Sequence, residues 1–297
     1  MRILITGATG LVGSALVQQW HTEHQLIALS RSVSTARQSL PANVAIVSSL
    51  TEVDFNQLDV VVNLAGEPIA GKRWSESQKQ RICQSRWALT EQLVGCIQAA
   101  HTPPHTLLNA SAVGFYGRQS EAAIDESYQS YYPEFSHDIC ARWENLANRA
   151  KSAQTRVCIL RIGIVLAAQG GALQKMLPAF KLGLGGVIGN GQQYMSWIHL
   201  DDLLAAMNYL LLQRQLNGVF NATAPMAVSN KQWTKLLAER LGKPALLPMP
   251  AMLLKLLFGE LSDLLLFGQN VYPQRLLDAG FVFKHNQLRS ALQSLSL

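Results

Sequence analysis

The stretch RILITGATGLVG, residues 2–13, opens the chain. It joins a short apolar run, which predicts a buried strand, to residues 14–20, which have the spacing of an apolar helix. In the G-x-x-G-x-x-G pattern between them, Gly7 allows a tight turn, Gly10 lets the backbone approach a pyrophosphate, and Gly13 lets helix and strand pack closely. A helix N-terminus also favours an anion. The stretch therefore predicts a dinucleotide-binding turn.

Further apolar runs follow, with helical segments between them. Near-continuous apolar strands that alternate with helices are typical of a parallel sheet covered on both faces. We predict an α/β fold with a doubly wound parallel sheet of the Rossmann type. Its strands are expected at 2–6, 26–29, 44–47, 60–64, 106–110, 156–165 and 218–222, and its clearest helices at 75–100 and 137–153.

Glycines become frequent after about residue 166, between Gly170 and Gly191. Such glycines permit tight turns and close approach to a ligand. We predict that residues 1–165, completed by about 200–224, form the dinucleotide-binding Rossmann domain. Residues 166–199 and 225–297 are expected to form a smaller α/β cap that holds the substrate.

Composition excludes a disordered chain, because 48% of the 297 residues are apolar and only 15% are charged. The four cysteines form no C-x-x-C pair, which argues against a disulfide framework or a zinc site and fits a reducing cytosol. The most apolar stretch, 251–268, is interrupted by Lys255, Glu260 and Asp263, so it predicts a buried helix pair and not a bilayer span. With no leader in view, we expect a soluble cytoplasmic protein without a membrane partner.

The formal net charge is +6, but no basic run suggests a nucleic-acid partner. The densest group of positive charges is Lys72, Arg73, Lys79, Arg81 and Arg86. It is either a site that attracts a phosphorylated small molecule or a solvated helix face.

The residues after the second predicted strand indicate which dinucleotide binds. An NAD site usually places an acidic residue there for the ribose 2′-hydroxyl. Here the strand ends in Ser30-Arg31-Ser32, and no acid lies between Glu23 and Glu52. Arg31 can pair with a 2′-phosphate and Ser30 can hydrogen-bond it, so we predict NADP(H). The alternative is that Arg31 is simply exposed.

The combined motifs resemble the short-chain dehydrogenase/reductase superfamily, in its extended, epimerase/dehydratase-like branch. The chain is most similar to the atypical NADP-binding "epimerase family" subgroup with its small C-terminal domain, from about residue 243 onward. The shared motifs are Asn63-Leu64-Ala65-Gly66-Glu67-Pro68-Ile69, Arg73-Trp74, Ser85-Arg86, Thr90, Trp143-Glu144, Arg161-Ile162-Gly163-Ile164-Val165-Leu166, Gly183-Leu184-Gly185-Gly186 and Ser196-Trp197-Ile198-His199.

The resemblance implies that Leu64 and Ala65 pass beside the adenine ribose and that Ser111 is the catalytic Ser/Thr beside the nicotinamide. Arg86, and less strongly Arg81, would reach the cofactor, and Val165 would line the nicotinamide pocket. Arg161 is either functional or an anchor under the cap. The full set of expected cofactor-binding residues is Gly7, Thr9, Gly10, Leu11, Val12, Ser30, Arg31, Leu64, Ala65, Gly66, Arg81, Arg86, Ser111 and Val165.

The superfamily's proton relay is a Tyr followed four residues later by a Lys, and no Y-x-x-x-K occurs in this chain. Counting back from Glu144 places His137 and Ala141 at the two positions. His137 and Tyr116 are therefore candidate acid/base groups. For His137 the alternative is an exposed helix residue, and for Tyr116 it is a structural or substrate contact.

His199, Asp201 and Asp202 have metal-ligand chemistry, but one imidazole makes no metal site, so we predict none. We expect Asp201 or Asp202 to cap a helix and His199 to be a buried packing residue.

Two functions remain open. One is an NADP-dependent oxidoreductase or epimerase acting on an unidentified small polar substrate, with a nucleotide-sugar as one option. The other is a catalytically silent NADP(H)-binding sensor or interaction protein. A homodimer is common in the superfamily and is expected only on that ground.

Overall fold

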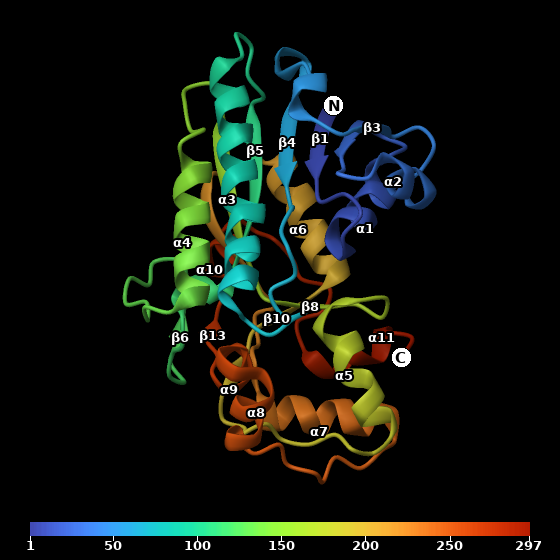
Figure 1. Ribbon diagram of the computed structural model, residues 1–297, viewed down its shortest axis with the longest axis vertical. Coiled ribbons are helices and arrows are strands. Elements are labelled where there is room, and N and C mark those ends of the chain that lie inside the picture. Colours follow the sequence, from blue (N-terminus) through green and yellow to red (C-terminus); the bar gives the residue numbers. More distant parts are fainter.

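The computed structural model describes residues 1–297 and has a sheet of seven parallel strands in the order β11-β7-β5-β4-β1-β2-β3 (Figure 1). The doubly wound fold predicted from the sequence is confirmed. The strand order reverses between β1 and β4, and such a reversal opens a crevice at the carboxyl ends of the strands. The strands are β1 (Arg2–Thr6), β2 (Gln25–Leu29), β3 (Ala45–Val47), β4 (Val60–Asn63), β5 (Thr106–Ala112), β7 (Arg156–Ile162) and β11 (Gly218–Ala222).

Two layers of helices cover the sheet. On β1, Ile3 and Ile5 pack into one core cluster while Leu4 packs into another, because successive side chains of a strand point to opposite faces. The first core includes residues of α1 (Leu11–Trp20), α2 (Val33–Ser39) and α6 (Leu200–Leu212). The second includes residues of α3 (Glu76–Ala99) and α4 (Phe135–Asn148).

A smaller region with its own core lies beyond the carboxyl ends of the strands (Figure 1). Its short strands pair two by two: β8 (Ile164–Leu166) with β10 (Trp197–His199), β9 (Tyr194–Met195) with β12 (Val228–Ser229), and β6 (Ala123–Ile124) with β13 (Asn270–Val271). Its helices are α5 (Gly171–Lys181), α7 (Asn230–Leu241), α8 (Ala251–Phe258), α9 (Asp263–Leu266) and α11 (Leu288–Ser294). Helix α10 (Gln274–Asp278) instead packs on β11, with Leu276 in the first core. The division into domains predicted above stays a prediction.

The single strand predicted over 156–165 is wrong, because the chain leaves the sheet at Gly163. A Cβ on Gly163 would lie 2.6 Å from the carbonyl oxygen of Ser196. This close approach lets the Ile164 N–H donate to the same carbonyl at 2.8 Å, and β8 then pairs with β10 instead of continuing β7.

The buried helix pair predicted over 251–268 is also wrong. Two helices do form there, α8 and α9, with a 3₁₀ turn (Gly259–Ser262) between them. Only Leu254, Leu261 and Ser262 of these three elements are buried. Hydropathy shows that a segment is apolar but not whether another element of the same chain covers it. None of the helices combines the length and the apolar character needed to cross a bilayer.

Candidate functional site

The glycine turn between β1 and α1 has no room for side chains. Gly7 has φ +70°, in the left-handed region, and a Cβ on it would lie 2.8 Å from the backbone of Leu64. A Cβ on Gly13 would lie 2.2 Å from the carbonyl oxygen of Gly7. Gly10 is the N-cap of α1 and offers no side chain to cap it, so the first-turn N–H groups remain available to an anion. Thr9 and Gly10 are exposed at the tip of the turn, and Val12 packs against the core.

A buried polar network holds the Leu64–Ala65 turn against this glycine turn. The Thr6 hydroxyl donates to Asn63 Oδ1 at 2.7 Å and accepts from the Ala65 N–H at 3.2 Å. Asn63 in turn donates to Thr90 and to Asn109. The structure thus brings together two segments, 57 residues apart, that were predicted to contact the cofactor.

Leu11 and Val165 meet at the start of α5. A Cβ on Gly171 would lie 3.2 Å from Leu11 Cδ2 and 3.3 Å from the carbonyl oxygen of Val165. These two predicted cofactor residues therefore lie on the same side of the crevice.

Ser30 and Arg31 follow the end of β2. Arg31 is exposed and forms no ion pair within the chain, whereas Ser30 Oγ lies 3.1 Å from the carbonyl oxygen of Ser32. A free guanidinium beside hydroxyl groups at this position fits the 2′-phosphate of NADP(H).

Arg86 packs its guanidinium onto the backbone beyond Ala65. A Cβ on Gly66 would lie 2.8 Å from Arg86 Cζ, and Arg86 Nη1 donates to the carbonyl oxygen of Glu67 at 3.0 Å. Arg81 instead turns to Gln78 Oε1 at 2.7 Å and is exposed. The basic group predicted from the sequence is therefore divided, since Arg86 adjoins the crevice and Arg81 faces solvent.

Ser111, the second-last residue of β5, lies beside a buried ion pair. Its hydroxyl donates to Glu144 Oε1 at 2.6 Å, and the Arg161 guanidinium donates to both oxygens of Glu144 at 2.9 and 2.8 Å. Burial lowers the pKa of Arg161, but the hydrogen bonds and the charge of Glu144 outweigh this effect and raise it. Arg161 thus anchors Glu144, and Glu144 holds the Ser111 hydroxyl.

Cys140, like Glu144, is an α4 residue that lies beside Ser111. Residues four apart share a helix face, so Cys140 and Ser136 lie on the face of Glu144. His137 and Ala141, the positions predicted from the sequence, are each one residue further along the helix. Burial, reinforced by the charge of Glu144, raises the pKa of Cys140 to about 11, so this thiol stays protonated near neutral pH. The spacing back from Glu144 was the signal in the sequence that pointed to Cys140.

The two candidate acid/base residues, His137 and Tyr116, are both buried. His137 is buried, with Nδ1 against the carbonyl oxygen of Phe115 and its ring stacked on Tyr131 at 4.0 Å between centroids. The Tyr116 hydroxyl donates to Asn221 Oδ1 at 2.8 Å inside the core. Burial raises the pKa of Tyr116, which disfavours its phenolate.

His199, not Asp201 or Asp202, is the N-cap of α6, because its Nδ1 accepts from the Asp201 N–H at 3.1 Å. His285 packs on it, with ring centroids 4.0 Å apart, a contact that no local pattern predicts. The two imidazoles and Asp201 form a group with metal-ligand chemistry. Within it, however, the Lys284 ammonium already lies 3.3 Å from Asp201 Oδ2 and the cap bond engages His199 Nδ1.

Comparisons with known proteins show which family the chain resembles. Residues 3–222 match the NAD dependent epimerase/dehydratase family, and residues 249–295 match a domain of unknown function (DUF1731). The chain is 38% identical to "Epimerase family protein SDR39U1 homolog, chloroplastic" of Arabidopsis thaliana over 99% of this chain and 86% of that protein. It is 34% identical to "Epimerase family protein SDR39U1" of Mus musculus over 99% of each.

Solved structures show the same similarity. The human epimerase family protein SDR39U1 (isoform 2), crystallised with NADPH, superposes with a TM-score of 0.91 at 31% identity and covers 100% of this chain and 99% of that one. A nucleoside-diphosphate sugar epimerase from Corynebacterium glutamicum gives a TM-score of 0.76 at 29% identity, over 98% of this chain and 57% of that one.

Proposed function

Because the chain belongs to the NAD dependent epimerase/dehydratase family, we propose that it binds NADP(H) at the carboxyl ends of β1 and β4 and acts as an oxidoreductase or epimerase on a small polar substrate. The observation that carries this proposal is the juxtaposition of the glycine turn, the Leu64–Ala65 turn and an unpaired Arg31. A relative of 31% identity was crystallised with NADPH, which supports the choice of cofactor.

The residues of this chain fit such a cofactor. The N–H groups at the start of α1 would bind the pyrophosphate, while Arg31 and Ser30 would bind the 2′-phosphate. Leu64 and Ala65 would lie beside the adenine ribose, and Val165 and Ser111 beside the nicotinamide. When bound, NADP(H) supplies or accepts a hydride at the substrate carbon.

Ser111 and Glu144 provide a route for the proton in place of the missing Tyr/Lys pair. Since Ser111 donates its own proton to Glu144 Oε1, its oxygen lone pairs can accept a hydrogen bond from a substrate hydroxyl. In the oxidative direction the substrate proton passes to Ser111 Oγ while the Ser111 proton passes to Glu144. In the reductive direction both transfers reverse. The bidentate contact from Arg161 fixes the carboxylate that takes part in this relay.

The nature of the substrate rests on weaker support. A nucleotide-sugar is favoured by the similarity to a nucleoside-diphosphate sugar epimerase at 29% identity. The basic residues Lys72 and Arg73, exposed between β4 and α3, would suit its phosphates. A cytoplasmic location and a homodimer remain predictions, the first of them in keeping with four free cysteines.

The second candidate function is NADP(H) binding without turnover. The absence of Y-x-x-x-K and the commitment of the Tyr116 hydroxyl to Asn221 favour it. Both functions share the cofactor, so catalysis separates them.

The test is NADPH consumption by the purified protein with a panel of aldehydes, ketones and sugar nucleotides, together with epimerisation of UDP-hexoses. We expect turnover that Ser111→Ala lowers by about 10²–10⁴-fold, while the Kd for NADPH changes less than about threefold. Thr155→Val is the control, since it also removes a buried hydroxyl. That hydroxyl donates to the carbonyl oxygen of Pro104 at the amino ends of β5 and β7, opposite the carboxyl ends where Ser111 lies. Full activity in Ser111→Ala would exclude the relay. Tight NADPH binding with no turnover on any substrate would favour the binding protein.

A further inference from the structure

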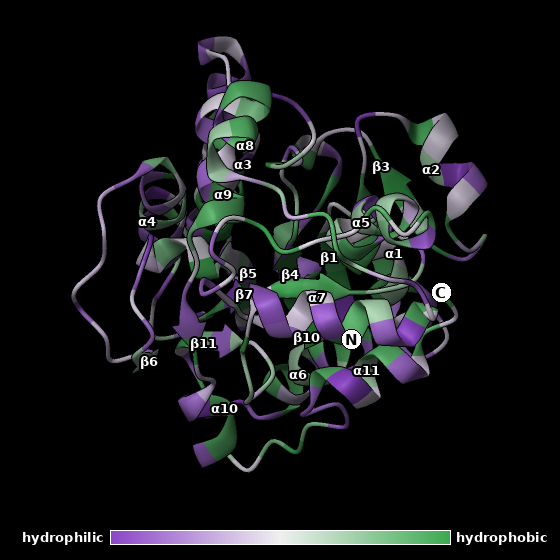
Figure 2. Cartoon of the chain, turned by 90° about the horizontal axis from the view of Figure 1, so that it is seen from below, coloured by the Kyte–Doolittle hydropathy of each residue, from purple (hydrophilic) through white to green (hydrophobic).

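The side of α8 that faces solvent is apolar. Met252 and Leu256 are 83% and 73% exposed, and Leu253 and Leu257 beside them are also exposed. Leu254 alone among the residues of α8 is buried. Figure 2 views the molecule from below, relative to Figure 1, and shows α8 largely in green, the colour of hydrophobic residues. The exposed side of this helix is thus mostly apolar, whereas an ordinary surface helix exposes polar residues there.

The apolar surface extends beyond α8 onto two neighbouring segments. The Leu247 N–H donates to the carbonyl oxygen of Gly185 at 3.3 Å, and the Met249 N–H donates to that of Val187 at 2.9 Å. These bonds hold residues 182–188 against 244–249, and each segment exposes two leucines. We call the resulting surface the apolar face; it comprises Leu182, Leu184, Leu246, Leu247, Met252, Leu253, Leu256 and Leu257. Apolar surface that no other element of the chain covers marks an interaction site.

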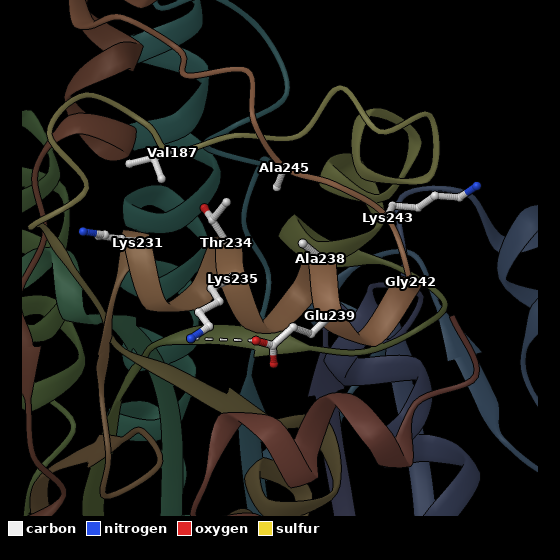
Figure 3. A pocket seen from close by; sticks show the side chains of 9 residues that line it. All are labelled: Val187, Lys231, Thr234, Lys235, Ala238, Glu239, Gly242, Lys243 and Ala245. Carbon is white, nitrogen blue, oxygen red and sulfur yellow. Dashed lines mark ion pairs between the residues drawn. The ribbon is translucent and has the colours of Figure 1, made fainter.

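Positive charge accompanies the apolar face. Lys181, Lys243 and Lys255 are exposed within or beside it and form no ion pair. A cavity of about 430 Å³ lies between α7 and the segments at Val187 and Ala245 (Figure 3). Of the lysines that line it, Lys231 forms no ion pair, whereas Lys235 is paired with Glu239.

The acidic side chains nearest in sequence are already paired. Glu239 bonds Lys235 and Arg289, Glu260 bonds Lys79, and Asp263 bonds Arg118. The apolar face therefore combines leucines and methionine with uncompensated lysines.

We propose that the apolar face docks on the surface of an anionic phospholipid bilayer. Apolar side chains would enter the boundary between headgroups and acyl chains, and the lysines would contact lipid phosphates. The eight residues of α8 span about 12 Å, so the helix lies in the interface and does not cross it. The charges within 251–268 still argue against a bilayer span, and the structure corrects only the burial expected for this segment. Its exposure allows a contact with the bilayer surface.

Charge decides between a bilayer and a second copy of the chain. In a twofold-symmetric dimer the same surface meets itself, so the lysines of both copies would gather around one apolar contact without a free carboxylate to pair them. An anionic lipid surface supplies the missing negative charge.

The docked orientation would bring the candidate site close to the lipid. The turn after α8 contacts the loop between β4 and α3, where a Cβ on Gly259 would lie 3.1 Å from Arg73 Nε. In the same turn Glu260 pairs with Lys79, in the first turn of α3. Docking itself requires no cofactor, so it can be tested separately from the proposed function.

The experiment is flotation of the full-length protein with phosphatidylcholine vesicles and with vesicles containing about 30% phosphatidylglycerol. We expect binding only to the anionic vesicles, and much less of it in 0.5 M than in 0.1 M NaCl because salt screens the lysines. Lys243→Ala/Lys255→Ala should weaken binding by about tenfold or more. Leu256→Glu should abolish it, whereas Val282→Glu, a change at a residue 85% exposed outside the apolar face, should not.

The proposal fails if the protein floats with neither vesicle at millimolar lipid, or if Leu256→Glu floats as the parent does. It also fails if light scattering detects a dimer that Leu256→Glu dissociates, since a second copy would then cover the apolar face. Circular dichroism of each variant verifies the fold, which a change at these exposed positions should leave intact.

Discussion

At the scale of the residue, the Ser111–Glu144–Arg161 contact buries two opposite charges together. Glu144 and Arg161 are 6% and 5% exposed at their side chains, so neither charge is solvated by water. Their bidentate contact and the Ser111 hydroxyl compensate the carboxylate instead. Removing one partner of such a pair leaves a buried charge without compensation.

We therefore expect Glu144→Leu to lower the free energy of unfolding by about 3–5 kcal/mol. Arg161→Met should cost a similar amount, but the double variant should cost less than the sum of the two, because neither buried charge then remains. Urea unfolding of the three proteins measures this coupling. Arg149→Ala, which breaks an exposed pair with Glu91, is the control and should cost less than about 1 kcal/mol. Additive single effects would contradict the account.

What the sequence could reveal of the site follows from how local each signal is. Ser111 was found because it directly follows a predicted strand, at the place of the superfamily's catalytic Ser/Thr. Cys140 was not proposed, although its four-residue spacing from Glu144 is visible in the sequence. His285 could not be found, because only the tertiary fold brings it to His199, 86 residues earlier.

At the scale of the element, the β1–α1 turn was predictable and the end of β7 was not. Gly7, Gly10 and Gly13 act within one turn, so their spacing in the sequence is enough to predict that turn. Gly163 is needed because a distant residue, Ser196, packs against it, and no local pattern records that contact.

Two glycine-to-alanine substitutions in helices should have opposite effects. In Gly13→Ala the new Cβ would lie 2.2 Å from the Gly7 carbonyl oxygen, so the turn must shift. We expect the free energy of unfolding to fall by about 1–3 kcal/mol. The affinity for NADPH should fall as well, because the same turn binds the cofactor. In Gly95→Ala, within α3, the Cβ meets nothing within 4 Å. That variant should gain roughly 0.5–1 kcal/mol, because alanine loses less backbone entropy on folding. Thermal unfolding compares them, and equal effects of the two substitutions would refute the packing argument.

At the scale of the whole molecule, the start of α6 holds the C-terminal segment. Asp202 is buried and accepts from the N–H groups of Lys284 and His285 at 2.7 and 2.9 Å. The rings of His199 and His285 pack together in the same place, tilted by 35°. The sequence predicted the sheet against which this C-terminal segment packs. It did not predict that α8 stays exposed, because whether another element covers a helix depends on how distant parts of the chain meet.

This contact should make stability depend on pH. Burial, followed by the charge of His285, lowers the pKa of His199, and Asp201, Asp202 and Lys284 are its other charged neighbours. As pH falls below about 6.5, the unfolded chain takes up the proton before the folded one, so the free energy of unfolding decreases.

The Tm should therefore fall between pH 7.5 and 5.5, and it should fall less in His199→Asn, which keeps a capping side chain but does not titrate. Burial also lowers the pKa of His105, which is unchanged in that variant. His105 therefore accounts for part of the pH dependence of the Tm that remains in His199→Asn. An identical pH dependence in the two proteins would show that His199 does not contribute.

The central claim is that the crevice between β1 and β4 binds NADP(H) with Arg31 on the 2′-phosphate. Its most direct test is a fluorescence titration with NADPH and NADH of the parent, of Arg31→Ala and of Arg149→Ala as a remote control. We predict that the parent and the control bind NADPH more tightly than NADH by about 10–100-fold, and that Arg31→Ala removes the preference by weakening NADPH alone. Absence of binding of either dinucleotide at millimolar concentration, or a preference for NADPH that survives Arg31→Ala, would contradict it.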